Sequence, residues 1–167
     1  MVEEGWDRED KWDVHYIRMA QLAADMSKDR STRVGAIVVG DEHEVLSTGF
    51  NGFPRRVDDD VDERHERPAK YSWTCHAERN AVFNAARNGV ALKGGTLYLN
   101  WEPYPCPECA RAIIQSGIIA VVGPDVPFPG SKDKNSIDWQ EGFKITKQMF
   151  EESGVLCRIV KWKEVKD

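Results

Sequence analysis

Two short segments of this sequence carry residues that can bind a metal ion and move protons. Residues 75–78 read Cys-His-Ala-Glu, and residues 105–109 read Pro-Cys-Pro-Glu-Cys. Alone, a Cys-x-x-Cys pair is equally typical of a structural zinc knuckle or a redox pair. Together, His76, Cys106 and Cys109 offer three ligands that suit zinc and leave a fourth tetrahedral position for water. Three protein ligands plus water is the pattern of a catalytic zinc site, whereas structural sites are closed by four ligands.

Glu78 follows His76 by two residues, so its carboxylate can reach a water molecule at the metal without being a ligand, which suits a proton shuttle. The ligands also stand at expected helix starts, whose partial positive charge offsets part of the charge of two thiolates. The alternative is a structural zinc site, which needs a fourth ligand. Cys75 adjoins His76 and Cys157 falls in the last expected strand, so neither is placed to close such a site. We interpret both as buried thiols.

The periodicity of apolar residues predicts the elements that position these segments. The expected helices cover residues 9–27, 75–88, 107–116 and 136–153, and the expected strands cover residues 34–39, 44–50, 96–100, 118–122 and 155–162. The first two strands form a hairpin, and the later alternation of helices and strands implies parallel crossovers with helices on both sheet faces. We therefore expect a three-layer α/β/α fold on a five-stranded mixed sheet, with core packing as the first explanation of the tryptophans.

The least regular segment is residues 51–73, which contains a dense charge run at 58–66. A loop this long inside a compact domain is usually functional, so we expect an active-site or regulatory loop. The charge run favours a solvated lid over a divalent-cation site. The chain contains no repeat and no linker, which predicts one domain over residues 1–167 with its core at about 12–162.

The two segments match the H-x-E…P-C-x-x-C signature of the zinc nucleobase deaminases. Beyond this signature, the sequence resembles the deoxycytidylate (dCMP) deaminase family from about residue 12 to 160. The matching stretches are Asp-Arg-Ser-Thr-Arg-Val-Gly-Ala at 29–36, Gly-Phe-Asn-Gly-Phe-Pro at 49–54, His-Ala-Glu-Arg-Asn-Ala at 76–81 and Pro-Cys-Pro-Glu-Cys-Ala at 105–110. The first two of these stretches, at 29–36 and 49–54, contain none of the expected zinc ligands, and they point to the nucleotide branch of the superfamily.

The resemblance implies a cytidine-deaminase-like fold and one catalytic zinc ion per subunit, held by His76, Cys106 and Cys109. It implies that Glu78 takes a proton from the attacking water and delivers protons to N3 of the base and to the departing amine. The products are then dUMP, which supplies dTTP synthesis, and ammonia. It also implies a homo-oligomer, commonly a hexamer, and dCTP or dTTP as candidate effectors.

The resemblance further implies substrate-binding roles for Asn51, which contacts the sugar, for Ser31 and Arg33, which help position the 5′-phosphate, and for Ala77. Arg33 offers a fork of donors that suits a phosphate, or it is an ordinary surface arginine paired with an acidic neighbour. Tyr104 either stacks on the base or packs against the sheet. These alternatives stay open at the level of sequence.

Three departures from the family pattern limit the inference. Arg55 and Arg56 follow the Asn-Gly-x-Pro turn, where they either favour an effector's phosphates or block that site. Residues 101–104 make a segment about two residues longer than usual, which leaves the C5 substituent of the base open. Arg79 stands at a commonly apolar position, where it faces a subunit interface, the phosphate or solvent. Residues 51–74 contain His65 but no cysteine, so we expect no second, structural zinc there.

Composition narrows the range of partners. The 167 residues include 23 Lys and Arg against 28 Asp and Glu, for a net charge of −5. This balance argues against a polynucleotide substrate, but a single arginine can hold one small phosphorylated ligand. The absence of an export signal or a membrane-length apolar run favours the cytoplasm. The alternatives left open are the same chemistry on dCTP, a free nucleoside or a C5-modified dCMP, and a non-catalytic zinc- or nucleotide-binding protein.

Overall fold

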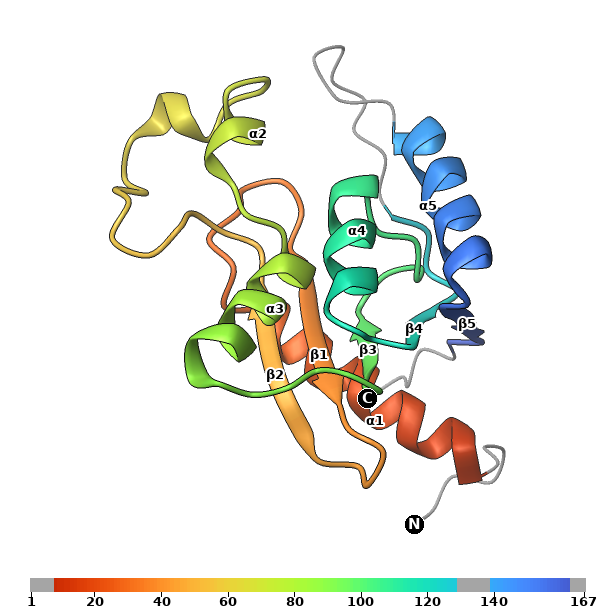
Figure 1. Ribbon diagram of the computed structural model, residues 1–167. Helices are drawn as coiled ribbons and strands as arrows, with labels where there is room; N and C mark the ends of the chain where they lie inside the picture. The colour runs from red at the N-terminus through yellow and green to blue at the C-terminus, as the bar shows by residue number, and fades with distance from the viewer. Residues whose placement is uncertain (1–7, 129–138, 163–167) are drawn as a thin grey trace.

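The computed structural model describes residues 8–128 and 139–162, which build one mixed β-sheet flanked by helices (Figure 1). The strand order is β2-β1-β3-β4-β5. β1 pairs antiparallel with β2 and β3, whereas β3, β4 and β5 run parallel. The strands are β1 (Gly35–Val39), β2 (Val45–Phe50), β3 (Thr96–Leu99), β4 (Ala120–Pro124) and β5 (Leu156–Val160). The expected five-stranded mixed sheet with a leading hairpin is confirmed.

Helices cover both faces of the sheet, as the alternation of elements predicted. α1 packs against β1, β3 and β4 on one face, while α3 packs on β1 and β2 and contacts α4, which contacts α5, on the other (Figure 1). The helices are α1 (Arg8–Ala24), η1 (Asp62–Arg64), α2 (Lys70–Trp73), α3 (Ala77–Asn88), α4 (Pro107–Gln115) and α5 (Trp139–Ser153).

Two hydrophobic cores follow from the alternation of side chains along the strands. On β1, Ala36 and Val38 belong to the core under α3, α4 and α5. Ile37 and Val39 belong to the core under α1. Each strand residue of β1 is buried, because both faces of this central strand are covered by helices. The two zinc-signature segments are therefore anchored on one face of the sheet, over its buried strand β1.

Several element boundaries differ from those expected. α1 ends at Ala24 rather than 27, because residues 25 and 26 form a turn and the Ser27 hydroxyl donates to the Asn51 carbonyl instead. β4 begins at Ala120 rather than 118, although Ile118 is buried; its apolar character reflects burial without strand pairing. Residues 51–73 contain η1 and α2, where no regular element was expected. The expected helix start at 136 lies outside the described residues.

The edge strand β5 corrects one interpretation. Cys157 is exposed, not a buried core thiol. Its neighbours Leu156 and Ile159 are exposed as well, and only Val160 of this strand is buried. The apolar residues of this segment predicted more burial than the structure shows, because β5 lies at the edge of the sheet and has a neighbouring strand on one side alone. The thiol donates to the carbonyl of Pro103 across 3.4 Å.

Gly49 on β2 lets the first turns of α3 lie directly on the sheet. A Cβ atom at this position would stand 2.3 Å from the Ala77 carbonyl oxygen and 2.5 Å from the Ala81 nitrogen. Real Cβ atoms do not approach backbone atoms this closely. The close packing of β2 against the helix start that carries His76 and Glu78 therefore depends on the absence of a side chain at position 49.

We expect Gly49→Ala to lower the free energy of unfolding by about 1–3 kcal/mol, since overpacking forces the backbone of α3 to shift. Urea unfolding followed by circular dichroism measures the change. The matched control is Gly52→Ala, because a Cβ at Gly52 has no heavy atom within 4 Å. Equal unfolding free energies for the two variants would contradict this role of Gly49.

Candidate active site

The structure brings the two zinc-signature segments together at adjacent helix starts. His76 is the N-cap of α3, Cys106 is the N-cap of α4, and Cys109 lies in the first turn of α4. The His76 Nδ1 atom lies 3.4 Å from the Sγ atom of each cysteine. All three ligand atoms fall within 4.8 Å of one another, the single cluster of this kind in the part of the chain that the structure describes.

The electrostatics of the three residues suit a cation. The pKa of the Cys106 thiol is lowered, first by the hydrogen bond from Cys109 and then, against the effect of burial, by the His76 ring. Burial alone lowers the pKa of His76, but the hydrogen bond to Cys106 and the charge of Glu78 outweigh it, so the net shift is upward. Two sulfur atoms and an imidazole nitrogen within 4.8 Å of one another are a donor set that zinc prefers, so the residues fit the metal.

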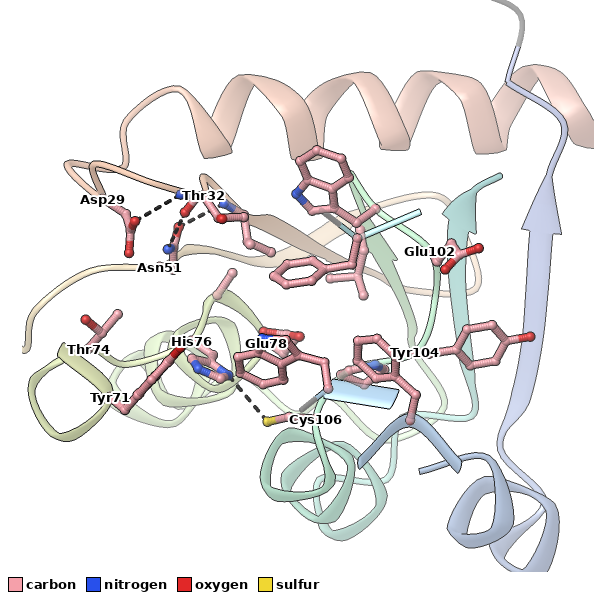
Figure 2. A pocket seen from close by; sticks show the side chains of 18 of the residues that line it. Asp29, Thr32, Asn51, Tyr71, Thr74, His76, Glu78, Glu102, Tyr104 and Cys106 are labelled. Atoms are coloured by element: carbon pink, nitrogen blue, oxygen red, sulfur yellow. Dashed lines mark hydrogen bonds between the residues drawn. The ribbon is translucent and has the colours of Figure 1, made fainter. Parts of the chain in front are cut away.

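Glu78 lies in the first turn of α3 and lines the same pocket as His76. Figure 2 shows its side chain beside that of His76. The residue is only 6% exposed, and burial raises the pKa of its carboxyl group. A raised pKa makes this carboxylate a better proton acceptor than an exposed glutamate, which suits a proton shuttle.

The pocket extends from this metal-binding end along an aromatic wall. Phe128 and Trp139 have ring centroids 5.8 Å apart, and Trp139 is also 6.0 Å from the His76 ring. Trp101 and Phe143 flank this pair, with centroids 6.0 Å and 6.4 Å from Phe128. We expected the tryptophans to pack in the core. For Trp101 and Trp139 this prediction was wrong, because both side chains are half-buried and line the pocket. Most of these rings meet edge to face, and the apolar wall that they form can hold a planar base.

The end of the pocket at Asp29 is charged, and it lies on the opposite side of Glu78 from Tyr104 in Figure 2. Lys70 donates to both carboxylate oxygens of Asp29, at 2.8 and 3.0 Å, and to the Ser31 hydroxyl at 2.8 Å. Asp29 also accepts from the backbone nitrogens of Ser31 and Thr32. Arg67 donates to the same Ser31 hydroxyl at 3.0 Å. Asp29, Arg67 and Lys70 line the pocket, yet none of the three was singled out from the sequence.

The Asp29–Lys70 pair is buried, with side chains 6% and 10% exposed. We expect Lys70→Met to lower the free energy of unfolding by about 3–5 kcal/mol, because it leaves a buried carboxylate without its counter-ion. Urea unfolding at pH 7 measures the loss. The double variant Asp29→Asn/Lys70→Met removes the stranded charge and should recover part of it. A double variant no more stable than the single one would contradict the explanation.

The same pair predicts a pH dependence. Burial raises the pKa of Asp29. Hydrogen bonds from Lys70 and from the backbone of Thr32 and Ser31 lower it by more than burial raises it, so the pKa lies below the usual 3.8. A depressed carboxyl pKa stabilises the fold above the unfolded-state value and loses this effect as the pH falls through the folded-state value. We expect Asp29→Asn to flatten the unfolding free energy below about pH 4, measured by urea titrations.

The structure places the other predicted substrate residues unequally. Asn51 is buried and lines the pocket, where its amide donates to the Thr32 carbonyl and accepts from the Val34 nitrogen. Ala77 lines the pocket too. Arg33 is exposed and is not among the lining residues, and Ser31 reaches the site through Lys70 and Arg67.

Tyr104 lines the pocket, but its ring is directed away from Glu78 and toward β5 in Figure 2. The ammonium of Lys147 on α5 lies 4.2 Å from the centroid of this ring. This placement favours packing beside β5 over stacking on a base next to Glu78. Tyr104 forms the far side of the pocket, beyond the aromatic wall.

The remaining arginines lie outside this pocket. Arg55 donates to Asn84 on α3, and Arg56 is exposed with a φ of 68°. Arg79, for which three roles were open, forms an ion pair with Glu108, which stands between Cys106 and Cys109. This pair joins the starts of α3 and α4, the two helices that carry the metal-binding residues.

The acidic run at 58–66 is tied to the chain before β1 by exposed ion pairs, Lys28 with Asp59 and Arg30 with Asp62. The backbone carbonyl of Asp59 also lies 2.7 Å from the His65 ring. The ion pairs hold a solvent-exposed segment beside the chain that precedes β1. Over residues 8–128 and 139–162, the run contributes no group of metal-binding side chains.

Residues 10–123 match the sequence model of the family described as the cytidine and deoxycytidylate deaminase zinc-binding region. The chain belongs to this family. The match includes His76, Glu78, Cys106 and Cys109, and confirms that the resemblance inferred from the motifs is correct.

Similar proteins within the deaminase family include an uncharacterised deaminase of Aliivibrio fischeri, 39% identical over 87% of this chain and 90% of that protein. The deoxycytidylate deaminase of phage T4 is 30% identical over 75% of this chain and 81% of its own length. The human deoxycytidylate deaminase is 37% identical over 67% of this chain, and the match spans 64% of the human protein.

The fold agrees with this membership. The dCMP deaminase of cyanophage S-TIM5, 24% identical, superposes with a TM-score of 0.66 over 92% of this chain and 99% of its own. That protein has also been solved in complex with dCMP and dUMP. Within the described residues, no helix has the length and apolar character needed to cross a membrane.

Proposed function

We propose that this deaminase-family chain hydrolyses dCMP to dUMP and ammonia. The observation that carries the proposal is the meeting of His76, Cys106 and Cys109 beside the buried Glu78 at one end of a pocket. Family membership supports the reaction type, and relatives named deoxycytidylate deaminase support the substrate. Such an activity would supply dUMP for dTTP synthesis.

The proposed chemistry divides between the metal site and Glu78. A zinc ion held by His76, Cys106 and Cys109 would make hydroxide available near neutral pH. Glu78 would take one proton from the water that attacks C4 of the base and deliver it to N3. It would then take the second proton, from the new hydroxyl group on C4, and deliver it to the amine at C4. The C4–N bond then breaks, so one water is consumed and one ammonia is released.

The rest of the pocket is suited to orient the substrate. The aromatic wall of Trp101, Phe128, Trp139 and Phe143 can hold the base and exclude water from the reacting atoms. We propose that Asn51, whose amide is fixed by Thr32 and Val34, contacts the sugar. Ala77, at the start of α3, lines the pocket next to Glu78, and we propose that the base contacts it there.

A substrate panel tests the proposal. Purified zinc-loaded protein would receive dCMP, dCTP, deoxycytidine, CMP and 5-methyl-dCMP in parallel, with product detected by chromatography. We expect dUMP from dCMP with the highest kcat/KM of the panel. A higher kcat/KM for dCTP, deoxycytidine or 5-methyl-dCMP would reassign the substrate, and no product from any compound by zinc-loaded protein would contradict a deaminase.

The wider biological setting is also proposed. We infer one deaminase domain over the whole chain, a cytoplasmic setting and a homo-oligomer, for which light scattering gives the mass directly.

Regulation by dCTP or dTTP is tested by adding each nucleotide to the dCMP assay. Arg55 and Arg56 are the residues whose replacement should alter such an effect, if their position after the Asn-Gly-x-Pro turn serves an effector.

A further inference from the structure

Arg67 is a cation in the pocket wall that has no acidic partner among residues 8–128 and 139–162. Its Nε atom donates to the Tyr71 hydroxyl at 3.0 Å, and its Nη2 atom donates to the Ser31 hydroxyl at 3.0 Å. Both acceptors are neutral. The ion pairs formed among the described residues do not include Arg67, although its side chain is half-buried and lines the pocket.

Three cations near Arg67 are compensated by carboxylates. Lys70, the other lysine or arginine among the residues lining this pocket, is paired with the buried Asp29. Lys28 and Arg30, on the segment that faces the same loop, pair with Asp59 and Asp62. Among the described residues that line the pocket, Arg67 is therefore the cation that has no carboxylate partner.

We propose that Arg67 binds the phosphate of a nucleoside 5′-monophosphate, a role that deepens the proposed function and rests on it. A guanidinium presents a planar fork of donors that matches phosphate oxygens. Its Nη1 atom makes none of the hydrogen bonds described above, so this part of the fork can face the pocket. Anion binding would provide the counter-ion that Arg67 lacks.

The surrounding residues select a single phosphate group. Asp29 neutralises Lys70, so a second and third phosphate would meet a carboxylate and no further uncompensated lysine or arginine among the described lining residues. Asp29 and Ser31 are positioning residues, because they fix Lys70 and Arg67 without being the anion's ligands. This assignment moves the phosphate anchor from Arg33, which is exposed outside the pocket, to the loop at 51–73.

Kinetics on paired substrates test the assignment. Arg67→Gln should lower kcat/KM for dCMP by about 10- to 100-fold, the loss expected for a charge-assisted hydrogen bond, and leave turnover of deoxycytidine within about twofold. Arg67→Lys should recover part of the loss, since it restores the charge without the fork. The matched control is Arg87→Gln, an exposed arginine of α3 outside the pocket. Equal losses on dCMP and deoxycytidine would overturn the assignment.

Binding measurements separate this proposal from the activity. By calorimetry, wild-type protein should bind dUMP more tightly than deoxyuridine, and Arg67→Gln should remove the difference. Inorganic phosphate should weaken the binding of dUMP to wild-type protein and not that of deoxyuridine, a result that depends on no variant. If dUMP preference depends on Arg67 but no cytosine compound is deaminated, the proposed function fails and the anion site stands. If dCMP is deaminated and Arg67→Gln retains the dUMP preference, the anion site fails and the proposed function stands.

Discussion

Replacing Glu78 by glutamine should reduce kcat for dCMP by at least about 10²- to 10⁴-fold while leaving the zinc content unchanged. Glutamine has the shape of glutamate, so it should fit the buried site beside His76, but it cannot take a proton from water and give it to N3. Because Glu78 belongs to none of the three metal-binding positions, its replacement should not release the ion. Zinc per chain, measured by atomic absorption, and initial rates with dCMP report the two effects separately.

The control for this variant is Glu151→Gln, an exposed glutamate of α5 outside the pocket. It should retain both activity and zinc. A Glu78→Gln protein that still turns over dCMP within tenfold of wild type would contradict the proton-transfer role. A protein that loses its zinc would instead make Glu78 part of the metal site.

Replacing Cys106 by alanine should remove both the metal and the activity. Only two of the three ligands would remain, and zinc sites of this kind need at least three protein ligands. After dialysis against a mild chelator, we expect close to one zinc per chain in wild type and close to none in Cys106→Ala, with turnover at background. Added zinc should raise the melting temperature of metal-free wild type, because a ligand that binds the folded state stabilises it, and should not raise that of the variant.

Cys157→Ala is the matched control, since this exposed thiol of β5 lies outside the metal cluster. It should keep zinc, activity and the zinc-dependent melting shift. If Cys106→Ala retained stoichiometric zinc under the same dialysis, the three-ligand site would be wrong.

The metal-binding part of the site could be predicted from sequence because its residues lie in two short segments. Their local spacing already places His76 beside Glu78 and Cys106 beside Cys109, and helix-start signals such as the proline at 107 fix their setting. The sheet was predictable for a similar reason, because its strands are short apolar runs. The approach of the two segments to 3.4 Å is tertiary information that the family signature supplied and periodicity alone does not.

The charged end of the pocket was missed because long-range contacts create it. Arg67 and Lys70 sit in a loop dominated by charged residues, and nothing local separates them from the exposed arginines nearby. Their partners on the chain before β1, Asp29 for Lys70 and Ser31 for Arg67, lie some forty residues earlier in the sequence. The sequence signal that could have found them is the lysine directly preceding an aromatic segment and the Cys-His-Ala-Glu motif.

The aromatic residues show a second limit. Trp101 and Trp139 are large apolar residues, and residues of this kind are usually assigned to the core. They line the pocket because the segment after β3 and the start of α5 meet there. Cys157 shows the converse, since an apolar strand at the sheet edge leaves its thiol exposed.

The most direct test of the account is to incubate the zinc-loaded protein with dCMP in ¹⁸O-labelled water and determine the product by mass spectrometry. The account predicts dUMP that carries one ¹⁸O atom in its base, formed together with one equivalent of ammonia. Recovery of unchanged dCMP, or of dUMP without the label, would contradict hydrolytic deamination at this site.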